Sequence, residues 1–170
     1  LERLAAARGV DPAALRLAYV RPEHAGINVV WKDVSRGMAA AVLNDVIEIA
    51  ERTVPLIANQ TLYLLDAPTL EEAHGLAAVL NSTVFDAMLV AVAERAKDAH
   101  YRCFGRTVAG LAMPRGFSDA SDALSREAKQ LQRGRGNPEA LDRYVAGLYG
   151  VSPDELDQLR RFVSRRTGAC

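Results

Sequence analysis

The chain has few of the residues that mark the common classes of site. Its 170 residues include two cysteines, three histidines and one tryptophan, and aromatic residues make up 6%. Cys103 and Cys170 lie far apart, so no disulfide framework is expected, and a reducing cytoplasm is the expected location. His100 and Cys103 have an H-x-x-C spacing, but no second pair completes the four ligands of a zinc site. His24 and His74 stand alone, and each is expected at the surface.

Long apolar runs and catalytic motifs are also absent. The most apolar stretch, residues 76–93, is interrupted by Asn81, Ser82, Thr83 and Asp86. It falls short of the roughly 18 consecutive apolar residues that cross a bilayer, and the chain does not open with a secretory signal pattern. No G-x-G-x-x-G, G-x-x-x-x-G-K-[ST] or G-x-S-x-G motif occurs. We therefore expect this chain to be neither an enzyme nor a membrane protein, and to hold no cofactor.

One enzymatic alternative is a metal-dependent nuclease built on Asp119, Glu127 and Lys129. These residues fall on a predicted helix, where Glu127 and Lys129 would point about 200° apart. A metal nuclease needs such groups to converge on one phosphate. A solvated helix face is the preferred interpretation.

The net charge is zero, but the charges are unevenly distributed. Residues 1–94 contain 7 Lys and Arg against 12 Asp and Glu, whereas residues 95–170 contain 14 against 9. A basic half beside an acidic half favours a one-sided surface for a polyanion. An ordinary solvated surface with five excess charges is the alternative.

The residue pattern predicts an α+β fold, with a small mixed β-sheet packed against a pair of helices. Stretches rich in β-formers predict strands at residues 27–31, 38–45 and 54–68. Thr69 is expected to begin an apolar helix, and a second, with Val92 on its apolar face, follows Asn81-Ser82. Asn81 is expected to end the first helix in a left-handed turn, and Ser82 or Thr83 to cap the second.

The C-terminal part predicts a helical hairpin. Asn137 and Ser152 are predicted N-caps, each followed by proline, and Glu155 completes a capping box with Ser152. Gly150 and Gly168 are expected to end these two helices. The expected organisation is a helical segment at residues 1–26, an α+β domain at 27–116 and a helical tail at 117–170.

Polar and basic residues gather in predicted loops and at strand ends. Lys and Arg suit phosphates, Asn and Gln pair with adenine, and Trp and Tyr can stack on bases. Arg102 and Arg106 are four residues apart and are expected on one side of residues 101–114, a predicted strand or extended loop. The candidate DNA-binding residues are Trp31, Lys32, Arg36, Asn59, Gln60, Lys97, Tyr101, Arg102 and Arg106. The alternative is that these are ordinary loop residues.

Four motifs carry a resemblance to a known family. They are "LAAVLNS" at residues 76–82, the basic segment 97–106, "LAMP" at 111–114 and "LDRYVAGLYGVSPDELDQL" at 141–159. In this order they resemble the target-recognition domain of TaqI-like adenine-specific DNA methyltransferases and fused restriction-modification enzymes. The resemblance covers about two-thirds of the chain and implies a closing strand at the LAMP motif.

The resemblance implies a DNA-reading part without its catalytic part. The family's N/D/S-P-P-Y motif and its S-adenosylmethionine motif do not occur in this sequence. The cofactor and the methyltransferase domain are therefore expected elsewhere in a longer parent protein. This chain, which begins at Leu1, would be a piece of that parent. The expected partner is double-stranded DNA, gripped while the target base is flipped into that domain. Asn81 and Ser82 are assigned a structural role.

A different class of function remains open. The C-terminal helical hairpin could be the docking surface of a protein-interaction or scaffold domain. Its second helix carries Arg160, Arg161, Arg165 and Arg166, which could instead contact phosphate.

Overall fold

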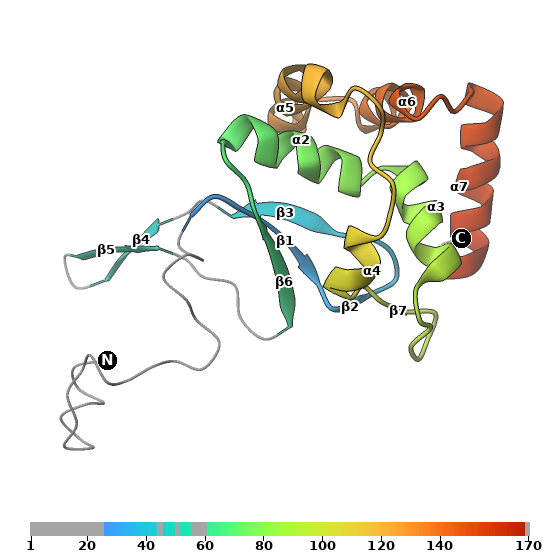
Figure 1. Cartoon of the computed structure of the whole chain (residues 1–170), viewed down its shortest axis with the longest axis horizontal. Helices are drawn as coiled ribbons and strands as arrows, with labels where there is room; N and C mark the ends of the chain where they lie inside the picture. The colour runs from blue at the N-terminus through green and yellow to red at the C-terminus, as the bar shows by residue number, and fades with distance from the viewer. Residues whose placement is uncertain (1–25, 44–45, 50–51, 56–60, 169–170) are drawn as a thin grey trace.

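The computed structural model describes residues 26–43, 46–49, 52–55 and 61–168, so the expected helices within residues 1–25 lie outside the described residues. Figure 1 shows helices stacked on one face of a small sheet, which confirms the α+β class. The elements are β1 (Asn28–Lys32), β2 (Val34–Ser35), β3 (Ala40–Leu43), β4 (Val46–Ile49), β5 (Arg52–Pro55), β6 (Leu62–Asp66), α2 (Leu70–Leu80), α3 (Thr83–Val92), β7 (Tyr101–Arg102), α4 (Gly105–Ala109), α5 (Phe117–Gln132), α6 (Pro138–Leu148) and α7 (Pro153–Thr167).

The central sheet has the order β3-β1-β6. Trp31 at its centre lies opposite Ala40 of β3 and Tyr63 of β6. Two smaller pairs accompany this sheet, β2 with β7 and β4 with β5. Every pairing among the described strands is antiparallel, where the sequence suggested a mixed sheet.

One core cluster joins the sheet to the helices that follow it as far as α6. Val29 of β1 and Val79 of α2 are fully buried, and the opposite side of α2 packs along α5 through Leu124. The same core cluster extends to Val145 of α6. Figure 1 shows α2 lying between the sheet and α5. The expected boundary before residue 117 therefore marks the start of α5 without dividing the core.

The break between α2 and α3 is held to the sheet by Asn81. The Ala40 N–H donates to Asn81 Oδ1 and Asn81 Nδ2 donates to the Ala40 carbonyl, both at 2.8 Å. The expectation of a left-handed Asn81 is wrong, since its φ is −85°. The Asn81 carboxamide instead makes the two hydrogen bonds with Ala40 that a neighbouring strand would make, and it covers part of the open edge of β3.

The next two residues fix the beginning of α3. Ser82 is its N-cap, and the Phe85 N–H donates to Ser82 Oγ at 3.3 Å. The Thr83 N–H and hydroxyl donate to the two carboxylate oxygens of Asp142 on α6, at 2.8 and 2.9 Å. Arg160 of α7 donates to the same carboxylate at 2.9 Å. An anion at a helix N-terminus also favours the helix dipole.

Asp86, one turn into α3, holds the loop that precedes β3. The Met38 N–H donates to its carboxylate at 2.7 Å. The carboxylate lies so close to Gly37 that a Cβ added there would come within 2.5 Å of Oδ2. Burial raises the pKa of the Asp86 carboxyl above its usual value. A side chain at position 37 would therefore force the Asp86 carboxylate to shift from its present position beside Met38.

The predicted ends of the C-terminal helices are confirmed. Asn137 accepts from two backbone N–H groups of α6, and Ser152 and Glu155 form the capping box of α7. Gly150 and Gly168 adopt φ of 74° and 68°, the left-handed conformation that ends a helix at low cost for glycine.

Two local expectations are wrong. Residues 101–114 contain a two-residue strand and the short helix α4, and residues 111–114 form no strand. Val92, expected on the apolar face of α3, is 64% exposed because the helix ends there. Within the described ranges no single helix is long and apolar enough to cross a membrane; α2 and α3 would suffice only together, and the chain bends by 62° between them.

Replacing Asp142 by alanine is expected to lower the free energy of unfolding by about 2–3 kcal/mol, because two donors at the beginning of α3 and one guanidinium lose their shared acceptor. Chemical denaturation measures this. Asp157→Ala is the matched control, because Asp157 is 61% exposed and its one ion pair with a described residue is to Arg160, and it should cost less than about 0.5 kcal/mol. Equal losses in the two variants would contradict the role of Asp142.

The raised pKa of Asp86 predicts a pH effect of definite sign. The folded chain binds this proton more tightly than the unfolded chain, so the Asp86 contribution is most favourable below about pH 4 and declines as the pH rises through the folded-state pKa. Asp86→Asn keeps an acceptor for the Met38 N–H and removes the decline. The stability of the variant relative to the wild type should therefore rise between about pH 4 and 7 in urea unfolding. A pH-independent difference would contradict this.

Candidate nucleic-acid interface

Residues 94–102 form a β-hairpin at one end of the molecule. Arg95 bridges Tyr101, the Ala96 N–H donates to the His100 carbonyl at 2.8 Å, and the Arg102 N–H donates to the Glu94 carbonyl at 2.9 Å. Its turn is made by two residues, Asp98 and Ala99. The sequence pattern did not predict this hairpin, and residues 97–106 were expected to form one basic segment.

The turn has an uncommon backbone conformation. Asp98 and Ala99 both have φ of 57°, as in the type I′ turns that usually contain Asn-Gly. The His100 N–H donates to the Lys97 carbonyl at 3.2 Å, which closes the turn. His100 Nδ1 lies 3.1 Å from the Lys97 carbonyl and 2.9 Å from that of Asp98. The histidine side chain thus supports a conformation that alanine adopts only at a cost.

The base of the hairpin is anchored in the core. Tyr101 is fully buried, and its hydroxyl donates to the Arg166 carbonyl in α7 at 3.1 Å. Trp31 is 5% exposed, and its indole N–H donates to the Cys103 carbonyl at 2.9 Å. The expectation that Trp31 and Tyr101 face DNA is therefore wrong in this structure. Both are structural residues that fix the position of the hairpin.

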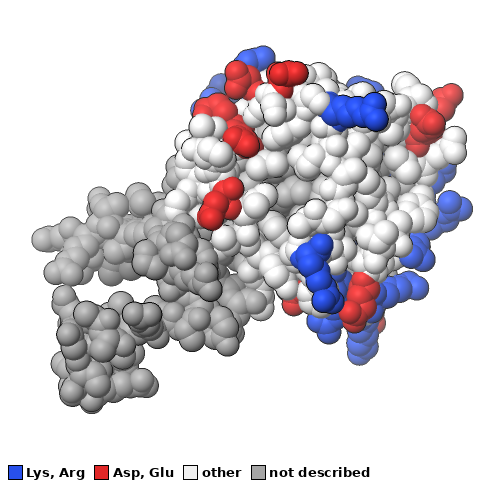
Figure 2. Space-filling view, viewed as in Figure 1, with Lys and Arg blue, Asp and Glu red and all other residues white. Residues whose placement is uncertain are grey.

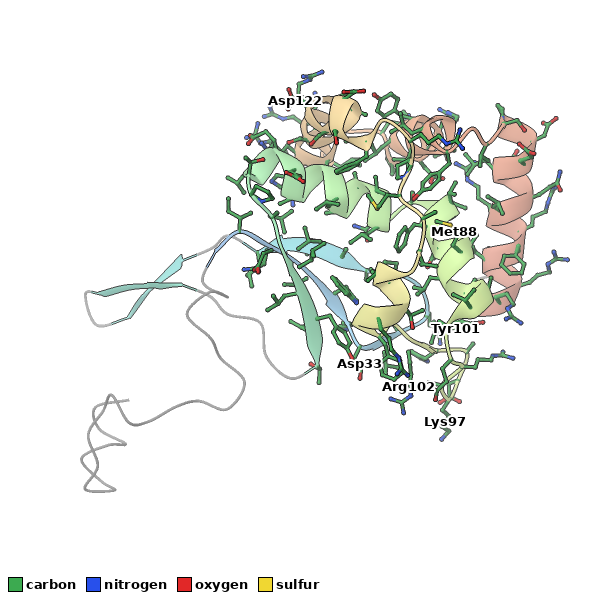
Figure 3. All side chains as sticks on the ribbon, in the orientation of Figure 1. Asp33, Met88, Lys97, Tyr101, Arg102 and Asp122 are labelled. Atoms are coloured by element: carbon green, nitrogen blue, oxygen red, sulfur yellow. The ribbon has the colours of Figure 1, made fainter. Side chains whose placement is uncertain are left out.

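The end of the hairpin also pairs with β2. Ser35 lies opposite Tyr101 and Val34 opposite Arg102, and the Cys103 N–H donates to the Asp33 carbonyl at 2.6 Å. This brings residues 32–36 beside residues 101–103, two segments that the sequence pattern indicated separately. Figure 3 shows Asp33, Arg102 and Lys97 at the same end of the molecule.

Two arginines converge on one aromatic ring. The guanidinium carbons of Arg102 and Arg106 lie 5.7 and 5.3 Å from the centre of the Phe104 ring. Such cation–π contacts order the guanidinium groups while leaving their N–H donors available. Arg102 also makes a solvent-exposed ion pair with Glu94 at 3.4 Å. Phe104 was not predicted as part of the site, although the alternating Arg-x-Phe-x-Arg pattern could have identified it.

The remaining predicted cations are exposed. Lys32 and Arg36 lie on either side of β2, and Lys97 precedes the hairpin turn. None of these three makes an ion pair with any residue that the structure describes. Asn59 and Gln60 lie outside the described residues. The structure therefore places Lys32, Arg36, Lys97, Arg102 and Arg106 around the hairpin and its base, which we call the hairpin end.

The last turn of α7 adds to the hairpin end, since Tyr101 contacts the Arg166 backbone. Arg166 is used internally, donating to the Val90 carbonyl at 3.2 Å, and Arg160 pairs with Asp142 and Asp157. Arg165 is exposed and has no ion pair with a described residue. Figure 2 shows Lys and Arg along the right and lower edges of this face, with a few acidic atoms among them, and most of the acidic atoms at its upper left.

A metal site is not evident in the described ranges, which contain no group of three or more His, Cys, Asp or Glu side chains placed to hold an ion. The nuclease alternative is also weakened, because Lys129 forms an ion pair with Glu71 of α2 at 3.0 Å.

Comparison with known proteins adds no relative, since no protein-family model, curated protein or solved structure matches the chain. The resemblance to target-recognition domains therefore stays a prediction from sequence motifs.

Ala99→Gly is expected to stabilise the chain by about 0.5–1 kcal/mol, because glycine adopts a φ of 57° without a Cβ clash. Thermal and chemical unfolding measure the change. Ala96→Gly, in the strand before the same turn, should be neutral or destabilising. Stabilisation by both variants, or by neither, would contradict a strained turn at Ala99.

Proposed function

We propose that this chain is a DNA-binding module that grips a duplex with the hairpin end. The observation that supports this most is the convergence of exposed cations from separate segments, residues 32–36, the hairpin, α4 and the end of α7, onto one buried scaffold. Cations on a rigid base can contact several phosphates at once without a large loss of side-chain freedom.

The proposed biological role is target recognition for an adenine-specific DNA methyltransferase or a restriction-modification enzyme in the cytoplasm. The chain itself would be non-catalytic, and the catalytic domain with its S-adenosylmethionine would lie outside it in the parent protein. The sequence motifs support this role, and Asn81 and Ser82, which belong to one of these motifs, make structural hydrogen bonds at the junction of α2 and α3. The absent strand at residues 111–114 is a departure from the family pattern.

Phosphate contact and base reading would be divided between different parts of the hairpin end. The cations surround the base of the hairpin, whereas its turn carries the exposed Asp98, with the half-buried His100 directly after the turn. A two-stranded β-ribbon fits the major groove, where a carboxylate can accept from the cytosine amino group. With Trp31 and Tyr101 buried, the turn is the part best placed for reading bases.

The alternative scaffold function has less support. The apolar faces of α6 and α7 are used within the chain, where Val84 of α3, Ala146 of α6 and Leu156 of α7 form one buried cluster. The helical hairpin therefore docks on its own domain.

Duplex binding measured at several salt concentrations tests the proposal. The triple variant Lys97→Ala, Arg102→Ala, Arg106→Ala should bind more weakly, and the slope of log affinity against log salt should fall by about 0.9 for each phosphate that the variant no longer neutralises. Because the charge changes by the same amount, the matched control is Arg126→Ala, Arg133→Ala, Arg135→Ala, three exposed arginines of α5 and the following linker. Equal weakening in both triple variants, or no duplex binding by the chain and its parent, would overturn the proposal.

A further inference from the structure

A cavity of about 290 Å³ lies between the edge strand β3 and helices α2, α5 and α6. Its walls are mainly small and apolar, including Ala77 and Ala78 of α2 and Leu131 of α5, with His74 among them. Residues 32–36 and the hairpin do not line it. Nothing in the proposed DNA contact uses it.

His74 lines this cavity without a hydrogen bond to any described residue, and it is buried, whereas Gln132, which also has no such bond, is exposed. His74 is 8% exposed, so the expectation that it lies at the surface is wrong. Burial lowers its pKa, with Lys129 adding to the effect and Glu71 opposing it, so the imidazole is neutral near pH 7. A neutral imidazole offers one donor and one acceptor.

The edge strand β3 forms another wall of the cavity, beside the walls that α2, α5 and α6 provide. Asn81 hydrogen-bonds both the N–H and the carbonyl of Ala40, which shows that these groups point away from β1. In an antiparallel strand alternate residues face the same way, so Val42 presents its N–H and carbonyl to the same open edge. No described residue bonds to them. Val42 is half-buried, so its open N–H and carbonyl lie at the cavity wall and remain within reach of a ligand that enters from solvent.

The structure itself contains a model for that partner. The Asn81 carboxamide makes two hydrogen bonds with the N–H and carbonyl of Ala40, which requires a donor and an acceptor side by side on one planar group. Val42 offers the same pair of groups, two residues further along the strand and facing the cavity. A carboxylate would match only the N–H, and an ammonium only the carbonyl.

We propose that this cavity is a binding site for a carboxamide. The amide pairs with the backbone of Val42 as Asn81 pairs with Ala40, its apolar body lies against Ala77 and Ala78, and His74 hydrogen-bonds a polar substituent. The amide can belong to a free small molecule or to the side chain of a glutamine in a peptide, because both present the same planar donor and acceptor.

Titration of the full ¹⁵N-labelled chain, followed by NMR, tests this site. Benzamide should give saturable shifts of the Val42 amide and the His74 ring signals, whereas benzoate, equal in shape but without a donor, should give none. N-acetylglutamine methylamide represents a glutamine side chain in a peptide. Tighter binding of this compound would identify a peptide as the natural ligand, and tighter binding of benzamide would identify a free small molecule. No shifts with either amide, equal shifts with benzoate, or shifts confined to other residues would overturn the proposal.

Two variants locate the site. Ala128→Leu adds volume at the half-buried α5 wall of the cavity and should weaken benzamide binding at least about tenfold. Ala109→Leu, on exposed α4 outside the cavity, is the control and should leave binding unchanged. His74→Phe keeps an aromatic ring and removes the polar contact, so it should weaken binding of N-acetylglutamine methylamide, which has further amide groups, more than binding of benzamide, which has none. Unchanged benzamide binding in Ala128→Leu, or unchanged N-acetylglutamine methylamide binding in His74→Phe, with native spectra, would overturn the assignment.

Discussion

Three consecutive side chains at the break between α2 and α3 hold the parts of this fold together. Asn81 bonds the edge of β3, Ser82 caps α3, and Thr83 bonds Asp142, which Arg160 of α7 also holds. The Asn81 and Thr83 bonds join elements far apart in sequence, and each of the three satisfies a group that a helix end or strand edge would leave open. The sheet, the central helices and the C-terminal helices therefore share one junction, which α7 joins through Arg160, while its buried Leu156 packs in a second cluster with α3 and α6.

This junction determines where the hairpin leaves the domain. It fixes α3, and the hairpin begins immediately after α3 ends. The other end of the hairpin is fixed by Trp31 and Tyr101, whose buried hydrogen bonds join it to the sheet and to α7. Trp31 and Tyr101 thus fix the position of the hairpin, and the exposed cations give its surface a positive charge. Among the residues that the structure describes, Asp98 and Ala99 at the tip are the non-glycine residues with positive φ.

Much of the secondary structure could be predicted because its signals are local. Thr69, Ser82, Asn137 and Ser152 cap helices through side chains that reach only two or three residues along the chain. The roles of Trp31 and Tyr101 could not be predicted, because their partners lie 72 and 65 residues away. An aromatic residue beside basic ones suggests a nucleic-acid contact in sequence, and only tertiary packing shows whether it is buried.

Dependence on partners far along the chain also explains the other differences between the sequence-based expectations and the structure. Asn81 is a common left-handed helix end, and what overrides that preference here is an edge strand 41 residues away. His74 is a lone polar residue until α5 and α6 enclose it beside β3. The structure places Lys32, Arg36, Lys97 and Arg106, which the sequence indicated as candidate DNA contacts, on the surface, and their convergence depends on the pairing of β2 with β7.

Amide hydrogen exchange at the junction tests its central role most directly. The Ala40 N–H is held by Asn81 and the Thr83 N–H by Asp142. If these contacts join the sheet and the helices into one cooperative unit, both amides should exchange only through global unfolding, with the same free energy as the core amide of Leu89. Exchange of Ala40 or Thr83 that is orders of magnitude faster than that of Leu89 would show that the junction opens locally and would contradict the account.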